Sequence, residues 1–224
     1  MSSVMNETER QKQLYCTPPH IVKALLRREF FPGTIWEPAA GRGHIVQTLL
    51  DCGYTDVIAS DLNVWGYDPC RREDFLVSTT MADSLITNPP FDRKREFLSQ
   101  AKRLARHKCA LLLPADFEYT LDFVRYHESD TDFPWKAIYI FRQPIPWLNV
   151  KDPGGKIRFA WYIFDRGYRG AVLREKISFQ RNSKNTGKAH GTSCNHPRSS
   201  QTAGDRVLLA IDNDASDQYG CSYK

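Results

Sequence analysis

The residues with the clearest chemistry lie in the stretch Thr87-Asn88-Pro89-Pro90-Phe91, which follows an apolar run, Leu85-Ile86, typical of the end of a buried strand. A strand must end here, because a proline has no N–H for the ladder and restricts the residue before it. What remains is a rigid loop with one carboxamide, backbone carbonyls that serve no ladder, and an aromatic ring. This set suits a planar ligand that carries an amine, although the same residues could form a plain strand-to-helix turn.

A second candidate stretch is Glu37-Pro38-Ala39-Ala40-Gly41-Arg42-Gly43, which follows the short β-type run Thr34-Ile35-Trp36 and precedes a helical pattern. A strand, a glycine-bearing turn and a helix open a nucleotide-binding α/β unit. Glycines let the backbone approach a ligand, and the start of the helix offers unpaired N–H groups. The G-x-G alone is weak, since neither the full dinucleotide fingerprint nor a Walker lysine is present. Glu37 at the strand tip indicates a cationic or amine-bearing ligand rather than a pyrophosphate.

Two further acidic positions follow the next predicted strand, residues 56–60. Asp61-Leu62 comes 18 residues after Gly43, near the spacing at which a carboxylate accepts hydrogen bonds from ribose hydroxyls. Asp74-Phe75 then pairs a carboxylate with a ring, which suits the amine and the face of an adenine. Each has a plainer interpretation, Asp61 as a helix cap and Asp74 as a surface acid beside a core ring. Four such features at successive strand ends favour one shared site, because the carboxyl ends of parallel strands meet at one edge.

The remaining pattern supplies the elements that position these residues. An apolar stripe predicts a helix over about 18–30, with Thr17 as its N-cap. The stretch 92–108 has a helical apolar face and seven Lys and Arg residues, which we interpret as a solvated helix face, with phosphate contact as the alternative. We expect strands at 109–114, 136–141 and 159–165, a helix at 115–126, and a short extension at 172–173. The strands at 136–141 and 159–165 are expected to pair as an antiparallel hairpin.

Composition bounds the class of protein. The chain has 224 residues, 41% hydrophobic content and a net charge of +5, which permits a polyanionic partner without requiring one. No apolar run approaches the roughly 18 residues of a membrane span, and the start lacks the apolar core of a signal peptide, so we expect a soluble cytoplasmic protein. Six cysteines without C-x-x-C spacing argue against a zinc ribbon or a disulfide framework. No metal site is expected, because His190, Cys194 and His196 lie in a polar stretch without periodicity.

Taken in order along the chain, the motifs resemble those of class I S-adenosylmethionine-dependent methyltransferases of the adenine-N6 type. They are Tyr15-Cys16-Thr17-Pro18, Glu37-Pro38-Ala39-Ala40-Gly41-Arg42-Gly43, Asp61, Asp74-Phe75 and Asn88-Pro89-Pro90-Phe91. The resemblance covers about residues 14–170 and is sharpest in the Asn-Pro-Pro-Phe box and the upstream Tyr-x-Thr-Pro. The run Phe159-Ala160-Trp161-Tyr162-Ile163-Phe164-Asp165 is also similar to the last strand of short phage and bacterial members, which implies a bacterial or phage-encoded enzyme.

The resemblance implies a Rossmann-like α/β fold with a mostly parallel seven-stranded sheet, a C-terminal antiparallel hairpin and helices on both faces. It implies a catalytic domain over residues 14–178, after a flexible N-terminus at 1–13. Residues 179–224 are polar, rich in glycine and serine and without periodicity, so we expect a disordered tail.

The cofactor that the resemblance implies is S-adenosyl-L-methionine. Gly41 and Gly43 would let the loop approach the cofactor, and Asp61 would hold its ribose hydroxyls. Asp74 and Phe75 would bind its adenine, while Glu37, Tyr15, Thr17 and Pro18 would surround its methionine end. The full set of implied cofactor residues is Tyr15, Thr17, Pro18, Glu37, Pro38, Ala40, Gly41, Gly43, Asp61, Leu62, Asp74 and Phe75.

The implied catalytic residues are Asn88, Pro89, Pro90 and Phe91. The target amine is a poor nucleophile, because its lone pair is delocalised into the purine ring. The Asn88 side-chain oxygen and the Pro89 carbonyl would accept its two N–H groups and direct the lone pair toward the sulfonium methyl. Phe91 would stack on a base extruded from the duplex. Neither a metal nor a covalent intermediate is needed, since transfer rests on orientation and electrostatics.

Another nucleophile is discounted. Pro69-Cys70 resembles the Pro-Cys of cytosine-C5 enzymes, but it lies before Asp74 instead of after the fourth strand.

The acceptor is the least determined part of the prediction. Unlike larger DNA-modifying relatives, the chain has no stretch after the Asn-Pro-Pro-Phe box long enough for an independent target-recognition domain. The loops at 126–136 and 142–158 and the tail remain, with Arg142, Trp147 and Lys151 as candidate substrate contacts. DNA adenine is the favoured acceptor and nucleic acid the expected partner. RNA adenine or a protein glutamine amide would use the same box, and a degenerate fold kept as a binding module is the non-enzymatic alternative.

Overall fold

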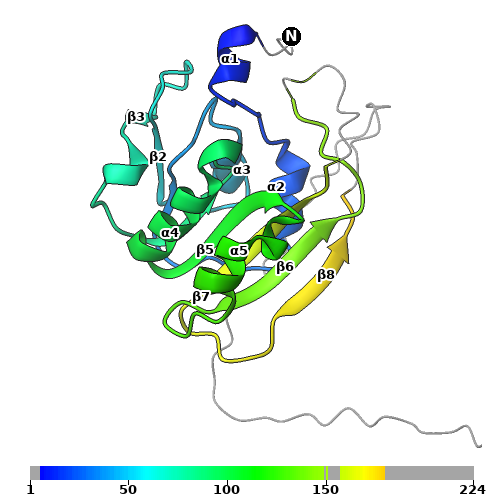
Figure 1. Ribbon diagram of the computed structural model, residues 1–224. Helices are drawn as coiled ribbons and strands as arrows, with labels where there is room; N and C mark the ends of the chain where they lie inside the picture. Colours follow the sequence, from blue (N-terminus) through cyan, green and yellow to red (C-terminus); the bar gives the residue numbers. More distant parts are fainter. Residues whose placement is uncertain (1–5, 149, 151–156, 180–224) are drawn as a thin grey trace, which may run out of the picture.

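The computed structural model describes residues 6–148, 150 and 157–179. Its centre is an eight-stranded sheet with the order β3-β2-β1-β4-β5-β7-β6-β8 (Figure 1). β7 runs antiparallel to β5 and β6, and every other neighbouring pair is parallel. The strands are β1 (Ile35–Glu37), β2 (Val57–Asp61), β3 (Arg71–Arg72), β4 (Ala82–Thr87), β5 (Ala105–Pro114), β6 (Trp135–Phe141), β7 (Phe159–Asp165) and β8 (Leu173–Ile177).

Helices cover both faces of the sheet. On one face α2 (Pro19–Leu26) and α3 (His44–Asp51) pack into an apolar core that includes Trp161. On the other, α4 (Lys94–Leu104) and α5 (Leu121–Phe123) pack into a core that includes Trp36 and Tyr162. The remaining elements are α1 (Glu7–Gln11), the 3-10 turns η1 (Phe75–Val77), η2 (Phe91–Arg93) and η3 (Phe117–Tyr119), and the π-helical turn η4 (Val124–Glu128).

The apolar runs of β5 and β7 follow from their central place, because a strand covered on both faces has no polar side. Residues 160–164 of β7 are fully buried and alternate between the two cores. Trp161 and Ile163 face α2 and α3, while Tyr162 and Phe164 face α4 and α5. The indole N–H of Trp161 donates to the Ile21 carbonyl at 3.1 Å, so this ring is buried without an unpaired donor.

The predicted hairpin of residues 136–141 and 159–165 is confirmed as β6 and β7, and the sheet is mostly parallel as expected. The strand count differs by one, since an eighth strand lies beside β6 and parallel to it. It starts at the predicted extension, Val172-Leu173. The guanidinium of Arg28, just after α2, pairs with the Glu175 carboxylate at 2.7 Å and ties the added strand to the helix layer.

Three predicted helical stretches are shorter than expected, and the one over 92–108 is limited to α4, Lys94–Leu104, because β5 begins at Ala105. The helix predicted over 18–30 ends at Leu26, after which the N–H groups of Arg27 and Arg28 satisfy the carbonyls of Lys23 and Leu25 in a closing turn. The helix predicted over 115–126 is split into η3, α5 and η4. The break falls at Thr120, whose backbone is extended and whose hydroxyl accepts from the Phe123 N–H as a new N-cap.

The segment predicted to be flexible, residues 1–13, contributes α1 over its described part. Asn6 and Glu9 cap the start of this helix reciprocally, since the Asn6 side chain accepts from the Glu9 N–H at 2.9 Å and the Glu9 carboxylate accepts from the Asn6 N–H at 3.0 Å. Glu9 is buried and also pairs with Arg42. Residues 6–13 are therefore joined to the domain instead of lying free.

A buried ionic cluster closes the edge of the sheet where β5 and β6 begin. The Glu29 carboxylate accepts from Lys108 Nζ at 2.9 Å, from Lys136 Nζ at 2.8 Å and from the Tyr139 hydroxyl at 2.8 Å. Asp165, at the end of β7, lies 3.2 Å from Lys108 Nζ and 3.6 Å from Lys136 Nζ. Two carboxylates thus balance two ammonium groups, which is the condition for burying charge without a large penalty.

Several predictions concern residues outside the described ranges. They include Lys151, the tail beyond Phe179, and the discounted metal ligands His190, Cys194 and His196. Within the described ranges, no helix has the length and apolar content to cross a membrane. Over the same residues, no group of three or more His, Cys, Asp and Glu side chains is arranged to hold a metal ion.

Candidate functional site

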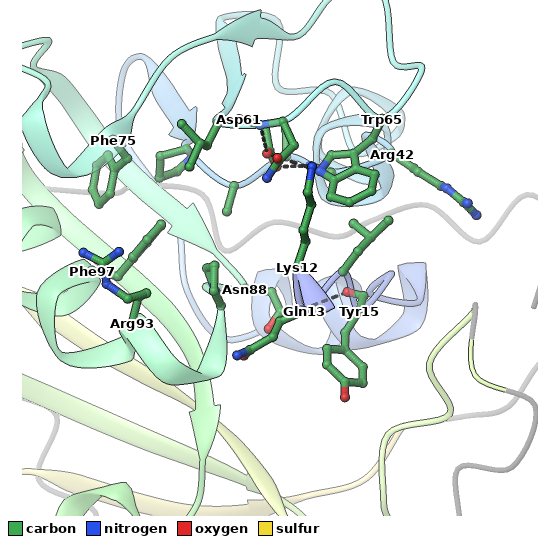
Figure 2. A pocket seen from close by; sticks show the side chains of 18 of the residues that line it. Lys12, Gln13, Tyr15, Arg42, Asp61, Trp65, Phe75, Asn88, Arg93 and Phe97 are labelled. Carbon is green, nitrogen blue, oxygen red and sulfur yellow. Dashed lines mark hydrogen bonds between the residues drawn. The ribbon is translucent and has the colours of Figure 1, made fainter. Parts of the chain in front are cut away.

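A cavity of about 370 Å³ lies at the carboxyl ends of β1, β2 and β4 (Figure 2). Its walls are formed by the segment 12–17, the glycine loop (residues 38–43), the end of β2, the Asp74–Leu76 turn and the loop that begins at Asn88. Of the predicted site residues, those that line the cavity are Tyr15, Thr17, Pro38, Ala40, Gly41, Asp61, Leu62, Asp74, Phe75, Asn88 and Pro90. The other predicted cofactor-binding and catalytic residues are next in sequence to residues that line the cavity: Pro18, Glu37, Gly43, Pro89 and Phe91. The motifs predicted to share one edge of the sheet are therefore brought together.

The glycine loop depends on both of its glycines. Gly41 and Gly43 have φ angles of 55° and 78°, which side chains other than glycine rarely adopt. A Cβ on Gly41 would lie 2.8 Å from a methyl of Leu14, and one on Gly43 would lie 2.6 Å from the Tyr67 ring. The loop therefore packs closely against the N-terminal segment on one side and the β2–β3 connection on the other.

Asp61 holds this loop against the end of β2. Its carboxylate accepts from the Gly41 N–H at 2.9 Å, the Asn63 N–H at 2.8 Å and the Trp65 indole N–H at 3.2 Å. Burial raises the pKa of Asp61, while these hydrogen bonds oppose the rise. A carboxylate has about four lone-pair directions, so one remains for a donor in the cavity. Asp61 is thus a cap for the loop and still able to accept from a ligand hydroxyl.

The Asp74-Phe75 pair lies at the far end of the cavity. Asp74 is exposed and its carboxylate accepts from the Leu76 N–H at 3.0 Å, as the N-cap of η1. The Phe75 ring is buried, 5.2 Å from Trp36 and 4.9 Å from Phe97 between ring centres. Both residues line the cavity while belonging to the local structure, so their contact with an adenine remains a prediction.

The Asn88 carboxamide has one hydrogen-bonded end and one end without a partner among the described residues. Its Nδ2 donates to the Tyr15 carbonyl at 3.0 Å and to Thr17 Oγ1 at 3.1 Å. A carbonyl only accepts, so the Tyr15 contact fixes which end of the amide is nitrogen. The opposite atom, Oδ1, is buried and has no hydrogen-bond partner among the described residues. The Tyr15–Thr17 segment therefore fixes the orientation of a carboxamide whose buried oxygen is left as an unpaired acceptor among the described residues.

Thr17 does not have the predicted role. Pro18 is the N-cap of α2 and no side chain caps that helix, because the Thr17 hydroxyl is used by Asn88 71 residues away. The prediction of Thr17 as an N-cap is therefore wrong. The Tyr-x-Thr-Pro element instead positions the carboxamide of Asn88.

An aromatic cluster supports the Phe91 ring. Its centre lies 4.7 Å from the Tyr15 ring, which is nearly parallel to it, and 5.2 Å from Phe159. Trp147, predicted as a substrate contact, is only 9% exposed and packs edge-on against Phe159 at 5.1 Å. Arg142, the second predicted contact, is exposed just after β6. In this structure Trp147 thus packs against the wall behind Phe91, and Arg142 is accessible to a ligand.

Glu37 lies beneath the glycine loop and not in the cavity lining. It is fully buried, and Oε1 accepts from the Thr87 hydroxyl at 2.6 Å and from the Ala39 N–H at 3.0 Å. Oε2 has no partner among the described residues. Burial raises the pKa of Glu37 to about 8. Glu37 therefore joins the tips of β1 and β4, and its predicted contact with a cationic ligand remains untested.

Several residues at the cavity are not among the predicted site residues. Lys12 extends toward Asp61 and Trp65 (Figure 2), with its ammonium 5.7 Å from the centre of the Trp65 ring. Gln13, Arg42 and His44 also line the cavity. Lys12 and Gln13 lie in a polar stretch with no pattern, so only their tertiary position identifies them.

Two other interpretations can be weighed against the ion pairs and the burial of the residues concerned. The basic residues around α4 are largely paired: Arg93 with Glu96, Arg95 with Asp122, Lys102 with Asp130 and Arg106 with Asp83. These pairs favour a helix face whose charges are balanced by neighbouring carboxylates over a phosphate-binding one. Burial raises the pKa of Cys70 to about 11, which disfavours the thiolate that a nucleophile requires.

No protein-family model and no curated protein matches the sequence. Solved structures do match in fold. A candidate RNA methyltransferase from Pyrococcus horikoshii is 18% identical, with a TM-score of 0.60 over 73% of this chain and 92% of that chain. A candidate class I S-adenosylmethionine-dependent methyltransferase from Listeria monocytogenes is 16% identical, with a TM-score of 0.56 over 72% of this chain and 65% of that chain.

A third structure is the modification subunit of a candidate type I restriction enzyme from Vibrio vulnificus. It is 14% identical, with a TM-score of 0.51 over 70% of this chain. The chain spans only 45% of that subunit. Together with the strand order, these similarities show that the chain has the class I methyltransferase fold, as predicted.

Proposed function

We propose that the chain is an S-adenosylmethionine-dependent methyltransferase that methylates the exocyclic N6 amine of adenine in DNA. The observation that carries the proposal is the Asn88 carboxamide, whose nitrogen is fixed by Tyr15 and Thr17 and whose buried oxygen has no partner in the described part of the chain. A buried acceptor without a donor is costly, so a donor from a ligand is expected at this position. A planar amine supplies such a donor.

The cavity residues fit S-adenosyl-L-methionine. The first N–H groups of α3 have no partner within the helix and face the loop that Gly41 and Gly43 form. Asp61 keeps one acceptor direction for a ribose hydroxyl. Asp74 and Phe75 lie at the end where an adenine would bind. When bound, the cofactor supplies an electrophilic methyl group on a sulfonium.

The chain's own residues would then prepare the acceptor amine. Asn88 Oδ1 and the Pro89 carbonyl each accept one N–H of the amine. The Pro90 carbonyl is already used by the Arg93 N–H at 3.1 Å and is not a candidate. Two accepted hydrogen bonds draw electron density onto the nitrogen and orient its lone pair, so the rate gain comes from orientation and electrostatics.

The base would be held by aromatic stacking. Tyr15 covers one side of the Phe91 ring and itself lines the cavity. A base in a duplex cannot reach this position, because its amine is paired and its faces are stacked, so the proposal requires an extruded or unpaired base. Arg142, and Lys151 outside the described residues, remain proposed substrate contacts.

The acceptor molecule is the part with real alternatives. The Vibrio vulnificus modification subunit supports DNA, whereas the Pyrococcus horikoshii structure favours RNA, and both share only the fold with this chain. A glutamine amide also presents a planar amine to an Asn-Pro-Pro-Phe loop. A binding module without activity is opposed by the complete Asn88 arrangement and by the intact glycine loop.

The test is incubation with methyl-labelled S-adenosylmethionine and unmethylated genomic DNA, followed by digestion and identification of the labelled nucleoside. Label in N6-methyladenine that is lost in Asn88→Ala would establish the reaction and the residue. Label in RNA or in protein glutamine, supplied in parallel, would move the acceptor and keep the chemistry. Absence of label from all three with cofactor binding intact would refute the enzyme.

A further inference from the structure

We infer that Gln13 is a positioning residue that holds the acceptor loop (residues 88–92) from the N-terminal segment, an inference that rests on the proposed function. Its carboxamide oxygen accepts from the Phe91 N–H at 2.7 Å and from the Asp92 N–H at 3.2 Å. These contacts join residues 78 and 79 positions apart in the chain. Figure 2 shows Gln13 beside Asn88 at the cavity.

The acceptor loop needs an external cap. Phe91 and Asp92 begin the 3-10 turn η2, and the first N–H groups of such a turn have no partner inside it. The preceding residue, Pro90, makes no side-chain cap, because a proline ring carries no acceptor. Gln13 therefore caps these two N–H groups, as a Ser, Thr, Asn or Asp at position 90 could have done locally.

The backbone of Gln13 indicates that this position is constrained. Gln13 has a φ of 55° and is the one described non-glycine residue with a positive φ. It follows the end of α1, where the Leu14 N–H donates to the Glu9 carbonyl at 2.8 Å in the six-to-one pattern of a Schellman motif. Glycine is the residue that this position favours, since it has no Cβ to strain. Backbone strain is often found at functional sites, and here the strained residue is the one whose side chain contacts the acceptor loop.

The helix α1, which precedes Gln13, also contacts the glycine loop. Glu9, one turn before Gln13, is buried and pairs with Arg42 between the two glycines. The segment Asn6–Gln13 thus contacts the glycine loop through Glu9 and the acceptor loop through Gln13. Because both contacts come from this one short segment, Gln13 positions Phe91 relative to the cavity.

The decisive variant is Gln13→Gly, which removes the cap and relaxes the backbone. We expect an unchanged or higher melting temperature, cofactor affinity within about twofold, and a single-turnover methyl-transfer rate about tenfold lower, since small displacements of reacting groups are costly. Gln13→Glu keeps the acceptor oxygen and should restore most of the rate. Gln47→Ala is the matched control, at an exposed glutamine whose side chain donates to Asp51 at 2.9 Å.

A readout independent of activity separates this inference from the proposed function. Pro89 and Pro90 have no amide hydrogens, so Phe91 and Asp92 carry the first exchangeable amides after Asn88. Hydrogen exchange at these two amides should be slow in the wild type and in Gln13→Glu, and at least tenfold faster in Gln13→Gly. Unchanged exchange in Gln13→Gly would overturn the cap, and faster exchange with an unchanged rate would overturn the positioning role. If the wild type methylates nothing, the proposed function fails, while the exchange data still decide whether Gln13 holds the loop.

Discussion

Asn88 has two functions that one substitution can separate. Its nitrogen is held by Tyr15 and Thr17, and its buried oxygen has no hydrogen-bond partner among the described residues. Asn88→Asp keeps an acceptor but places a carboxylate oxygen against the Tyr15 carbonyl, so the side chain must rotate. We expect methyl transfer to fall about 100-fold, as on loss of one electrostatic group at a reacting centre. Rates with saturating cofactor and the cofactor dissociation constant, which should stay near that of the wild type, check this.

Thr17→Val tests the supporting half of this arrangement. It removes one of the two acceptors of the Asn88 nitrogen and keeps the Tyr15 carbonyl. The expected loss is about 1 kcal/mol, or roughly fivefold in rate, the usual value of one neutral hydrogen bond. Thr55→Val, on an exposed threonine, is the control. A wild-type rate for Thr17→Val would mean that Tyr15 alone orients the amide.

Glu37 gives a prediction about pH and stability. Burial raises its pKa to about 8 from an ordinary value of 4.5, so the folded protein holds a proton that the unfolded chain releases between those values. The free energy of unfolding should therefore fall as the pH rises from about 5 to about 8 and then level off. In Glu37→Gln, which keeps the size and loses the titration, this contribution should vanish. Urea denaturation of both proteins at pH 5, 6.5 and 8 measures it, and parallel curves would show that Glu37 is ionised in the folded state.

At the scale of elements, the glycine loop and the N-terminal segment act as one unit. Gly41→Ala would bring a Cβ within 2.8 Å of Leu14 and would strain a φ of 55°. We expect a loss of stability of about 1–2 kcal/mol from the backbone alone, with further loss from the clash. Gly53→Ala has a φ of 91° and open space around the added methyl, so it isolates the strain.

The double variant Gly41→Ala with Leu14→Ala completes this test. It should recover the part of the loss that the clash causes and leave the part due to strain, as denaturation midpoints of the four proteins would show. If Leu14→Ala recovers nothing, the two segments do not press on each other.

The elements that the sequence predicts well are those with a strong local signal. The run of β7 is fully apolar and bounded by charged residues, so its bounds agree with the prediction at 159–165. Gly41 and Gly43 identify their turn because few other residues tolerate its backbone. The helix predicted over 115–126 fails at Thr120, since a hydroxyl that caps a new turn competes with a helix that the apolar spacing favours.

The site is predicted less completely than the fold, because its decisive contacts join distant segments. The motifs of Tyr15 and Asn88 are visible in the sequence, but their hydrogen bond spans 73 residues. Nothing local shows that Thr17 serves Asn88 instead of α2, or that Gln13 caps Phe91. Residue type gave the chemistry of the acceptor loop, and only the folded chain shows what holds it.

At the scale of the whole molecule, the candidate site and the buried ionic cluster of Glu29 lie at opposite ends of the strands of the sheet. The cavity lies at the carboxyl edge, and the Glu29 cluster with Lys108, Lys136 and Tyr139 lies at the opposite edge. Glu29 is 2% exposed, so Glu29→Gln leaves the buried Lys108 and the partly buried Lys136 with only Asp165 as an anionic partner among the described residues. Breaking such a cluster costs about 3–5 kcal/mol.

We therefore expect Glu29→Gln to unfold at clearly lower urea concentration while its cofactor affinity and methyl-transfer rate at 15–20 °C stay near those of the wild type. Glu175→Gln is the matched comparison, since its pair with Arg28 is half-exposed and such pairs contribute about 0–1 kcal/mol. Similar losses in both variants would show that burial adds nothing to the Glu29 cluster. A large fall in the rate of folded Glu29→Gln would show that this edge of the sheet is coupled to the acceptor loop.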